Sequence, residues 1–159
     1  MAFVRSTEAH ALIKGIDVSA ALECEGVIGV WTAADLELPP LPEVPGLERP
    51  TLASDKVRFV GEAVAVVVAE SKYQAADGIE LVVVDYEPLK AVTNIAEATA
   101  DNAPLLFEEL GSNTVAEVPT ADDLQAIFDA APHTETINLV NNRCTAAPIE
   151  TSACLADYG

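Results

Sequence analysis

The sequence predicts an α/β (α+β) fold in which helices pack on a mixed β-sheet. The first observation is an unbroken apolar run rich in β-branched residues, Ala63–Ala69, which is too short for a helix and typical of a strand covered on both faces. The second is the order of the next signals along the chain, namely a helix start at Ser71 and a second valine-rich run at residues 81–85, which we also expect to be a buried strand. Strand, helix and strand in about thirty residues indicate a βαβ unit with a right-handed crossover.

A second unit of the same kind comes earlier in the chain. Ala11–Asp17 has the pattern of a moderate strand, residues 20–25 that of a short helix, and residues 27–31 (VIGVW) that of the next strand. Gly26 comes after the short helix, where a left-handed helix end favours glycine. Two strand–helix–strand units together predict a sheet with helices packed against it.

Helix-start signals, in which a side-chain oxygen accepts from an amide of the first turn, recur along the chain. They are found at Asp17 or Ser19, at residues 32–35, at 71–74 and at 94–97. In the helix that Ser71 begins, we expect Ala75, Ala76 and Ile79 to share one side and Gly78 to weaken the helix.

Composition limits the classes of function. The chain has 159 residues, 50% of them hydrophobic, which is enough for one domain or for one domain and part of another. Its net charge of −18 repels phosphate backbones and anionic lipid, which argues against nucleic acid and membranes as partners. No apolar run has the length of a membrane span, and residues 1–10 do not resemble a secretory signal, so we expect a cytoplasmic protein. The acidic surface is read as a solvated face or as a docking face for a basic partner subunit.

The cysteines do not form a recognisable metal or disulfide pattern. Cys24, Cys144 and Cys154 leave one thiol unpaired in any disulfide scheme, and their spacing is not that of a zinc site. We therefore expect free thiols in a reducing compartment.

Residues 38–50 hold half of the ten prolines and predict an extended surface loop. The alternatives are a proline-rich ligand for an aromatic groove, or a loop that borders a groove for a small ligand.

The last forty residues have their own pattern. Residues 120–123 carry a cap signal for an amphipathic helix that ends at Pro132 and has apolar residues at helical spacing, namely Leu124, Ile127, Phe128 and Ala131. Residues 133–142 predict a strand with Ile137 and Leu139 inward, and residues 153–158 its partner strand.

Two stretches also resemble a known family. The segment DKVRFVGEAVAVVVAESKYQAADGIELVVVDYEPLKAV, residues 55–92, resembles the central part of the a/b hammerhead domain. That domain belongs to the large, molybdenum-binding subunits of the xanthine dehydrogenase, aldehyde oxidase and aerobic carbon monoxide dehydrogenase family. Residues 10–36, HALIKGIDVSAALECEGVIGVWTAADL, are similar to the same domain.

The closing block, NLVNNRCTAAPIETSACLADYG, resembles the opening of the family's molybdopterin-binding domain and leans toward the carbon monoxide dehydrogenase branch. Arg143, Pro148, Glu150 and Thr151 occupy the motif positions. Glu150 can be read as a general base or as a structural carboxylate paired with Arg143, and the second reading is favoured. The resemblance implies a hammerhead domain at residues 1–100 with its first strand truncated. It also implies a connector and the N-terminal fragment of the molybdopterin domain at residues 101–159.

The resemblance further implies an oxidoreductase that inserts a water-derived oxygen into a small-molecule substrate at a molybdopterin centre. Its electrons would pass to 2Fe-2S clusters and FAD on partner subunits or domains. The family's cofactor-binding loops and its glutamate base lie further along the subunit than Gly159, so we expect no catalytic, cofactor-binding or metal-ligating residue here. His10 is expected to be structural. The chain would be an inactive scaffold that binds the remainder of the large subunit, and the alternative is a stand-alone, non-catalytic acidic interaction domain.

Overall fold

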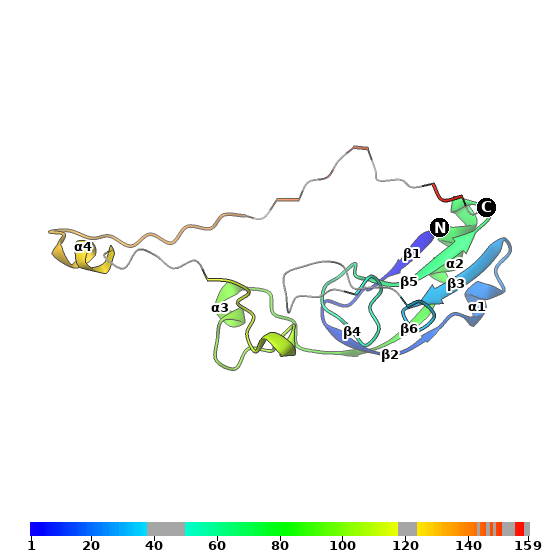
Figure 1. Ribbon diagram of the computed structural model, residues 1–159, viewed down its shortest axis with the longest axis horizontal. Helices are drawn as coiled ribbons and strands as arrows, with labels where there is room; N and C mark the ends of the chain where they lie inside the picture. The colour runs from blue at the N-terminus through cyan, green and yellow to red at the C-terminus, as the bar shows by residue number, and fades with distance from the viewer. Residues whose placement is uncertain are drawn as a thin grey trace. The chain divides into compact units, whose positions relative to one another are not determined.

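The computed structural model describes residues 1–37, 50–117, 124–142, 144–145, 147, 149–150 and 155–157. The chain divides into two compact units, residues 1–117 and 118–159. The elements of unit 1 (Figure 1) are β1 (Ala2–Arg5), β2 (Ala11–Asp17), α1 (Ser19–Leu22), β3 (Val27–Thr32), β4 (Lys56–Val57), β5 (Ala63–Ala69), α2 (Lys72–Glu80), β6 (Val83–Pro88), α3 (Ile95–Ala98) and the 3₁₀ helix η1 (Glu108–Leu110). In unit 2 the structure describes one helix, α4 (Leu124–Ala130).

Unit 1 contains two three-stranded sheets. The first has the order β1-β5-β3 and the second the order β4-β2-β6. Every pairing between the described strands is antiparallel, and the ladders join residues that are far apart in sequence, such as Ala2 with Val67 and Asp17 with Val83. Odd-numbered strands form one sheet and even-numbered strands the other, so the chain changes sheet at each step.

This arrangement confirms the α/β class, with helices packed on sheets, and corrects the connections. The strands joined by α2, namely β5 and β6, lie in different sheets, and so do β2 and β3, which α1 joins. The predicted right-handed βαβ crossovers are therefore wrong. The physical reason is that β5 already has β1 and β3 on its two edges, while the link from β2 to β3 is shorter than the dozen residues that a parallel crossover needs.

Unit 1 contains two buried clusters, and β5 contributes to both. One cluster contains Ala11, Ala53, Val57 and Val64, and the other contains Val4, Ala65 and Val67. Successive side chains of a strand point to opposite faces, so β5 supplies Val64 to one cluster and Ala65 and Val67 to the other. The prediction that Ala63–Ala69 is a strand covered on both faces is confirmed.

Helix α2 packs closely on the first sheet. Its start is as predicted, because the Ser71 side chain accepts a hydrogen bond from the Gln74 amide at 3.3 Å. Gly78 is buried, and a Cβ at this position would lie 2.9 Å from Val67 Cγ1 and 3.0 Å from Val27 Cγ2. Gly78 therefore allows the helix to approach the sheet, and the helix continues through it. Ala76, which we expected on the packed side, is exposed.

Strand β6 is half-buried, whereas the sequence predicted a fully buried strand at residues 81–85. Val83 is 63% exposed, while Val84 and Tyr86 pack against a core cluster. The reason is position, because β6 is the outer strand of its sheet and pairs on one side with β2.

The remaining local signals are partly confirmed. Asn94 caps α3 by accepting from the Glu97 amide at 2.8 Å, and Gly26 has a left-handed φ of 79°. Residues 32–35 form a turn instead of a helical turn, with the Asp35 carboxylate accepting from the Thr32 amide at 2.8 Å. Asp17 accepts from the Ser19 amide at 2.9 Å just before α1.

In unit 2 the predicted helix is present as α4, but the described part of the unit leaves its apolar residues exposed, with Ile127 and Phe128 each at 59%. The cap signal at 120–123 lies outside the described residues. The predicted strand at 133–142 is wrong, because these residues have no strand structure and Leu139 is 86% exposed. Its expected partner, of which residues 155–157 are described, has none either, and a strand needs a paired neighbour to be stable.

None of the helices in the described ranges has the length and apolar character needed to cross a bilayer.

Candidate functional site

His10, which we expected to be structural, lies buried in unit 1. It is 5% exposed, its Nδ1 is 2.9 Å from the Lys90 carbonyl oxygen, and its own carbonyl accepts from the Leu89 amide at 2.8 Å. Because a carbonyl oxygen can only accept, Nδ1 carries the proton of this hydrogen bond. Nε2 is buried and has no partner within the described part of the chain. His10 thus joins the start of β2 to the segment that comes after β6.

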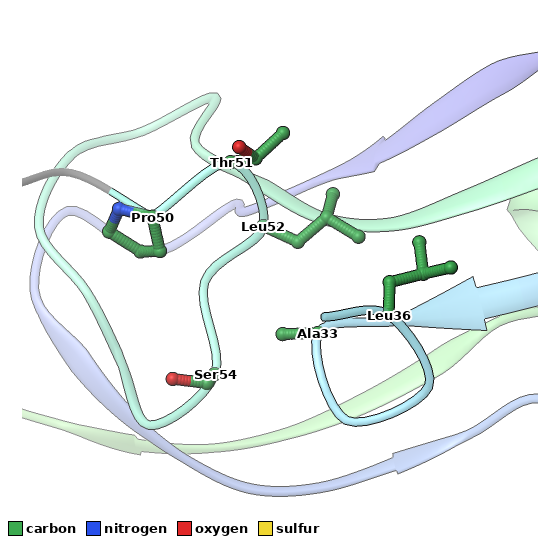
Figure 2. Close-up of a pocket in the computed structure, with 6 residues that line it drawn as sticks. All are labelled: Ala33, Leu36, Pro50, Thr51, Leu52 and Ser54. Atoms are coloured by element: carbon green, nitrogen blue, oxygen red, sulfur yellow. The ribbon is translucent and has the colours of Figure 1, made fainter. Parts of the chain in front are cut away.

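A small hollow lies between the turn after β3 and residues 50–54. It has a volume of about 190 Å³ and is lined by Ala33, Leu36, Pro50, Thr51, Leu52 and Ser54. Figure 2 shows the Leu52 side chain directed toward that of Leu36 across the hollow. All six lining residues are neutral, so they offer no titratable group for acid–base chemistry. The hollow adjoins the proline-rich stretch, most of which lies outside the described residues.

A larger, open groove of about 550 Å³ runs between β1, the end of α2 and β6. Its lining is mainly aliphatic and aromatic, with Phe3, Val83 and Tyr86 among the contributors, and Arg5 and Glu80 bring charge to it. Arg5 is engaged elsewhere, because it donates to the Gly61 carbonyl at 2.8 Å and lies 5.8 Å from the centre of the Phe3 ring. The groove resembles an apolar contact surface more than a reaction site.

A charged cluster that sequence reasoning missed lies at β4. The Lys56 ammonium forms an ion pair with Glu108, and Arg58 Nε donates to the Leu106 carbonyl at 2.9 Å. The Arg58 guanidinium also lies 4.8 Å from the centre of the Phe107 ring, as in a cation–π contact. The hydrogen bond from Lys56 is the largest of the effects that lower the pKa of Glu108 below its ordinary value of 4.5. The signal in the sequence was two basic residues on either side of Val57 in a chain of strongly negative charge.

The remaining candidates from the sequence do not come together into a site. Glu150 is exposed, and its expected partner Arg143 lies outside the described residues, so the pairing stays a prediction. Cys24 and Cys144 are free thiols, the first partly buried and the second exposed, whereas Cys154 is not among the described residues. Within the described ranges, no three His, Cys, Asp or Glu side chains are placed to hold a metal ion.

Comparison with known proteins identifies the relatives of this fold. A family model described as "Aldehyde oxidase and xanthine dehydrogenase, a/b hammerhead domain" matches residues 1–90. The carbon monoxide dehydrogenase large chain of Afipia carboxidovorans is 37% identical over 97% of this chain and 21% of its own length. The nicotine 6-hydroxylase large subunit of Paenarthrobacter nicotinovorans is 39% identical over 98% of this chain and 20% of its own length.

A solved structure agrees with these matches. Carbon monoxide dehydrogenase from Oligotropha carboxidovorans is similar with a TM-score of 0.61 and 48% identity, over 65% of this chain and 13% of that chain. The present chain thus spans about a fifth of the length of the curated relatives it matches. Through the a/b hammerhead domain at residues 1–90, it belongs to the aldehyde oxidase and xanthine dehydrogenase family.

Proposed function

We propose that this chain is the N-terminal part of a molybdenum hydroxylase large subunit and serves there as a structural scaffold. The observation that carries the proposal is the alignment of nearly the whole chain with one fifth of two relatives, a carbon monoxide dehydrogenase large chain and a nicotine 6-hydroxylase large subunit. A solved structure similar to this chain is described as a Cu,Mo-CO dehydrogenase. One relative is named as a dehydrogenase chain and the other as a hydroxylase subunit. The complete protein would accordingly oxidise a small molecule with oxygen derived from water.

The described residues do not fit a molybdopterin centre. A pterin with its phosphate needs a pocket with several hydrogen-bonding and charged groups, whereas the hollow near Leu52 is small and neutral and the open groove is mainly apolar. We therefore assign none of the described residues to the cofactor or to catalysis. In the proposed full enzyme, molybdopterin belongs to the remainder of the large subunit, and 2Fe-2S clusters and FAD belong to partner subunits or domains.

The scaffold role is supported by how unit 1 is built. The central strand β5 of the first sheet contributes to both buried clusters, which makes a rigid support with an open, mainly apolar groove on its outside. In this proposal residues 1–100 form the hammerhead support and residues 101–159 lead into the molybdopterin-binding domain. The assembled enzyme would be cytoplasmic.

The first experiment asks whether the chain alone holds molybdenum. The 159-residue chain and a full-length carbon monoxide dehydrogenase large chain are expressed in a host that makes the cofactor, and the metal is measured by mass spectrometry. We expect the relative to retain molybdenum and the chain to contain none above the blank. Stoichiometric molybdenum in the pure chain would overturn the scaffold role.

The second experiment tests the role within a subunit. A chimera carries this chain in place of the aligned segment of the carbon monoxide dehydrogenase large chain, and its metal content and dye reduction with carbon monoxide are measured. A working scaffold restores both to the range of the parent enzyme.

The second candidate function is an acidic interaction domain without catalysis, and the net charge of −18 is the observation that favours it. It predicts that the chimera folds but takes up no molybdenum, while the isolated chain remains well folded by circular dichroism. That pair of results would replace the scaffold proposal.

A further inference from the structure

The segment after α3 folds largely on itself. We use the name strap for residues 104–113, which include η1 but no strand. Asn113 closes the strap with three bonds: its Nδ2 donates to the carbonyls of Ala98 at 3.1 Å and Pro104 at 3.0 Å, and its Oδ1 accepts from the Leu106 amide at 3.1 Å. This pattern is that of a compact loop whose ends are held together by one side chain.

Two cations connect the strap to the sheets. Lys56 pairs with Glu108, and Arg58 binds the Leu106 carbonyl and covers the Phe107 ring. Both cations belong to a rigid base, because Val57 between them is fully buried and the Arg58 amide donates to the Glu62 carboxylate at 2.5 Å. We call Lys56 and Arg58 the clamp.

The burial of the partners is unequal. The Lys56 side chain is 10% exposed, whereas that of Glu108 is 58% exposed. No strap residue belongs to either buried cluster. Release of the strap would therefore leave both clusters buried. Its cost would be the loss of the contacts at the clamp together with loss of the partial burial of the strap's own residues 104–107 and 110.

We propose that the strap is a conformational device that opens and closes as a unit on the clamp while the two sheets stay folded. The strap lies near the end of unit 1, which ends at residue 117, so opening detaches this part of the unit from β4. The clamp therefore sets how firmly the end of unit 1 is held against its sheets. This inference does not depend on the proposed catalytic context.

Hydrogen exchange followed by mass spectrometry tests the device on the full 159-residue chain. In the wild type, peptides from the strap should exchange faster than those from β5, by a local opening that leaves the sheets closed. Glu108→Gln removes the charge on the exposed side of the clamp without disturbing the core. It should raise exchange of the strap by about three- to tenfold, the expected loss for one charge-assisted contact that is partly screened by water.

Matched variants separate the clamp from general effects. Glu109→Gln removes a neighbouring charge in the same short helix that the clamp does not bind, and it should leave the strap unchanged. Lys56→Met keeps the buried stem and removes the ammonium, and it should repeat the effect of Glu108→Gln. Raising the salt concentration should accelerate exchange of the strap in the wild type and much less in Glu108→Gln.

Three results would overturn the proposal. The first is exchange of the strap at the same rate as β5 in the wild type, which would mean that no separate opening occurs. The second is an equal effect of Glu109→Gln and Glu108→Gln. The third is faster exchange in β5 as well as in the strap of Glu108→Gln, which would show a global loss of stability.

Discussion

Gly78→Ala gives the sharpest test of how α2 packs on the first sheet. In an ordinary helix interior this substitution stabilises by about 1 kcal/mol, because alanine loses less conformational entropy on folding. At Gly78 the new Cβ would lie 2.9 Å from Val67 Cγ1 and 3.0 Å from Val27 Cγ2. Val67 is fully buried, and valine side chains have little rotamer freedom, so neither methyl group can easily move away.

The cost of this overpacking is about 2 kcal/mol, which exceeds the gain from helix propensity. We therefore expect Gly78→Ala to destabilise the chain by a net of about 1 kcal/mol, equivalent to a fall of about 4 °C in Tm. The measurement is urea unfolding monitored by circular dichroism and by the fluorescence of Trp31, the single tryptophan of the sequence. Ala76→Gly, on the exposed side of the same helix, reports the propensity effect alone.

A double mutant supplies the decisive control. In a Val67→Ala background the nearer methyl group is gone, so Gly78→Ala should change sign and become stabilising. If Gly78→Ala stabilised the wild-type chain as much as it stabilises the Val67→Ala variant, the close packing described for α2 would be refuted.

The remaining predictions concern two glycines, pH and salt. Gly26→Ala should cost more stability than Gly61→Ala. Both glycines have positive φ (79° and 93°), but a Cβ at Gly26 would meet the Gln74 side chain, whereas a Cβ at Gly61 would meet nothing within 4 Å. Equal losses of stability in urea unfolding would contradict this. Lys56 lowers the pKa of Glu108, so this ion pair stabilises the closed strap above pH 4.5, and the stabilisation is lost as the pH falls further. Opening of the strap, followed by hydrogen exchange, should therefore depend less on pH in the acid range in Glu108→Gln than in the wild type. The isolated chain should self-associate through its outer strands at high salt, where the charge of −18 is screened, and constant mass by light scattering across a salt series would count against it.

Local features were the ones that the sequence could predict. The Ser71 cap, the Asn94 cap and the positive φ of Gly26 depend on neighbours within a few residues, and each is found in the structure. The buried strand Ala63–Ala69 was also predictable, because seven apolar residues have no side to present to water.

Features that depend on distant partners could not be read from local patterns. The strands before and after α2 look like a crossover unit, yet the choice of β1 and β3 as partners of β5 is made by segments many residues away. Val83 lies in an apolar run but is exposed, because β6 is an outer strand. Gly78 was predicted to weaken its helix, and only the positions of Val27 and Val67 reveal why glycine is needed there.

The clamp was missed for a related reason. Lys56 and Arg58 precede the predicted strand Ala63–Ala69, and their partners Glu108 and Phe107 lie about fifty residues further along. Oppositely charged residues at that separation are common in any sequence, so their pairing becomes visible only from the fold.

The alternation of strands between the two sheets has a consequence for synthesis of the chain. β1 emerges from the ribosome first but must wait for β5, and β2 must wait for β4 and β6, so neither sheet can close while its early strands are being made. A break anywhere between β2 and β5 would divide both sheets at once. Nascent chains are therefore exposed to aggregation until residue 88 has been made, and complementation by two separately encoded halves of unit 1 should be inefficient.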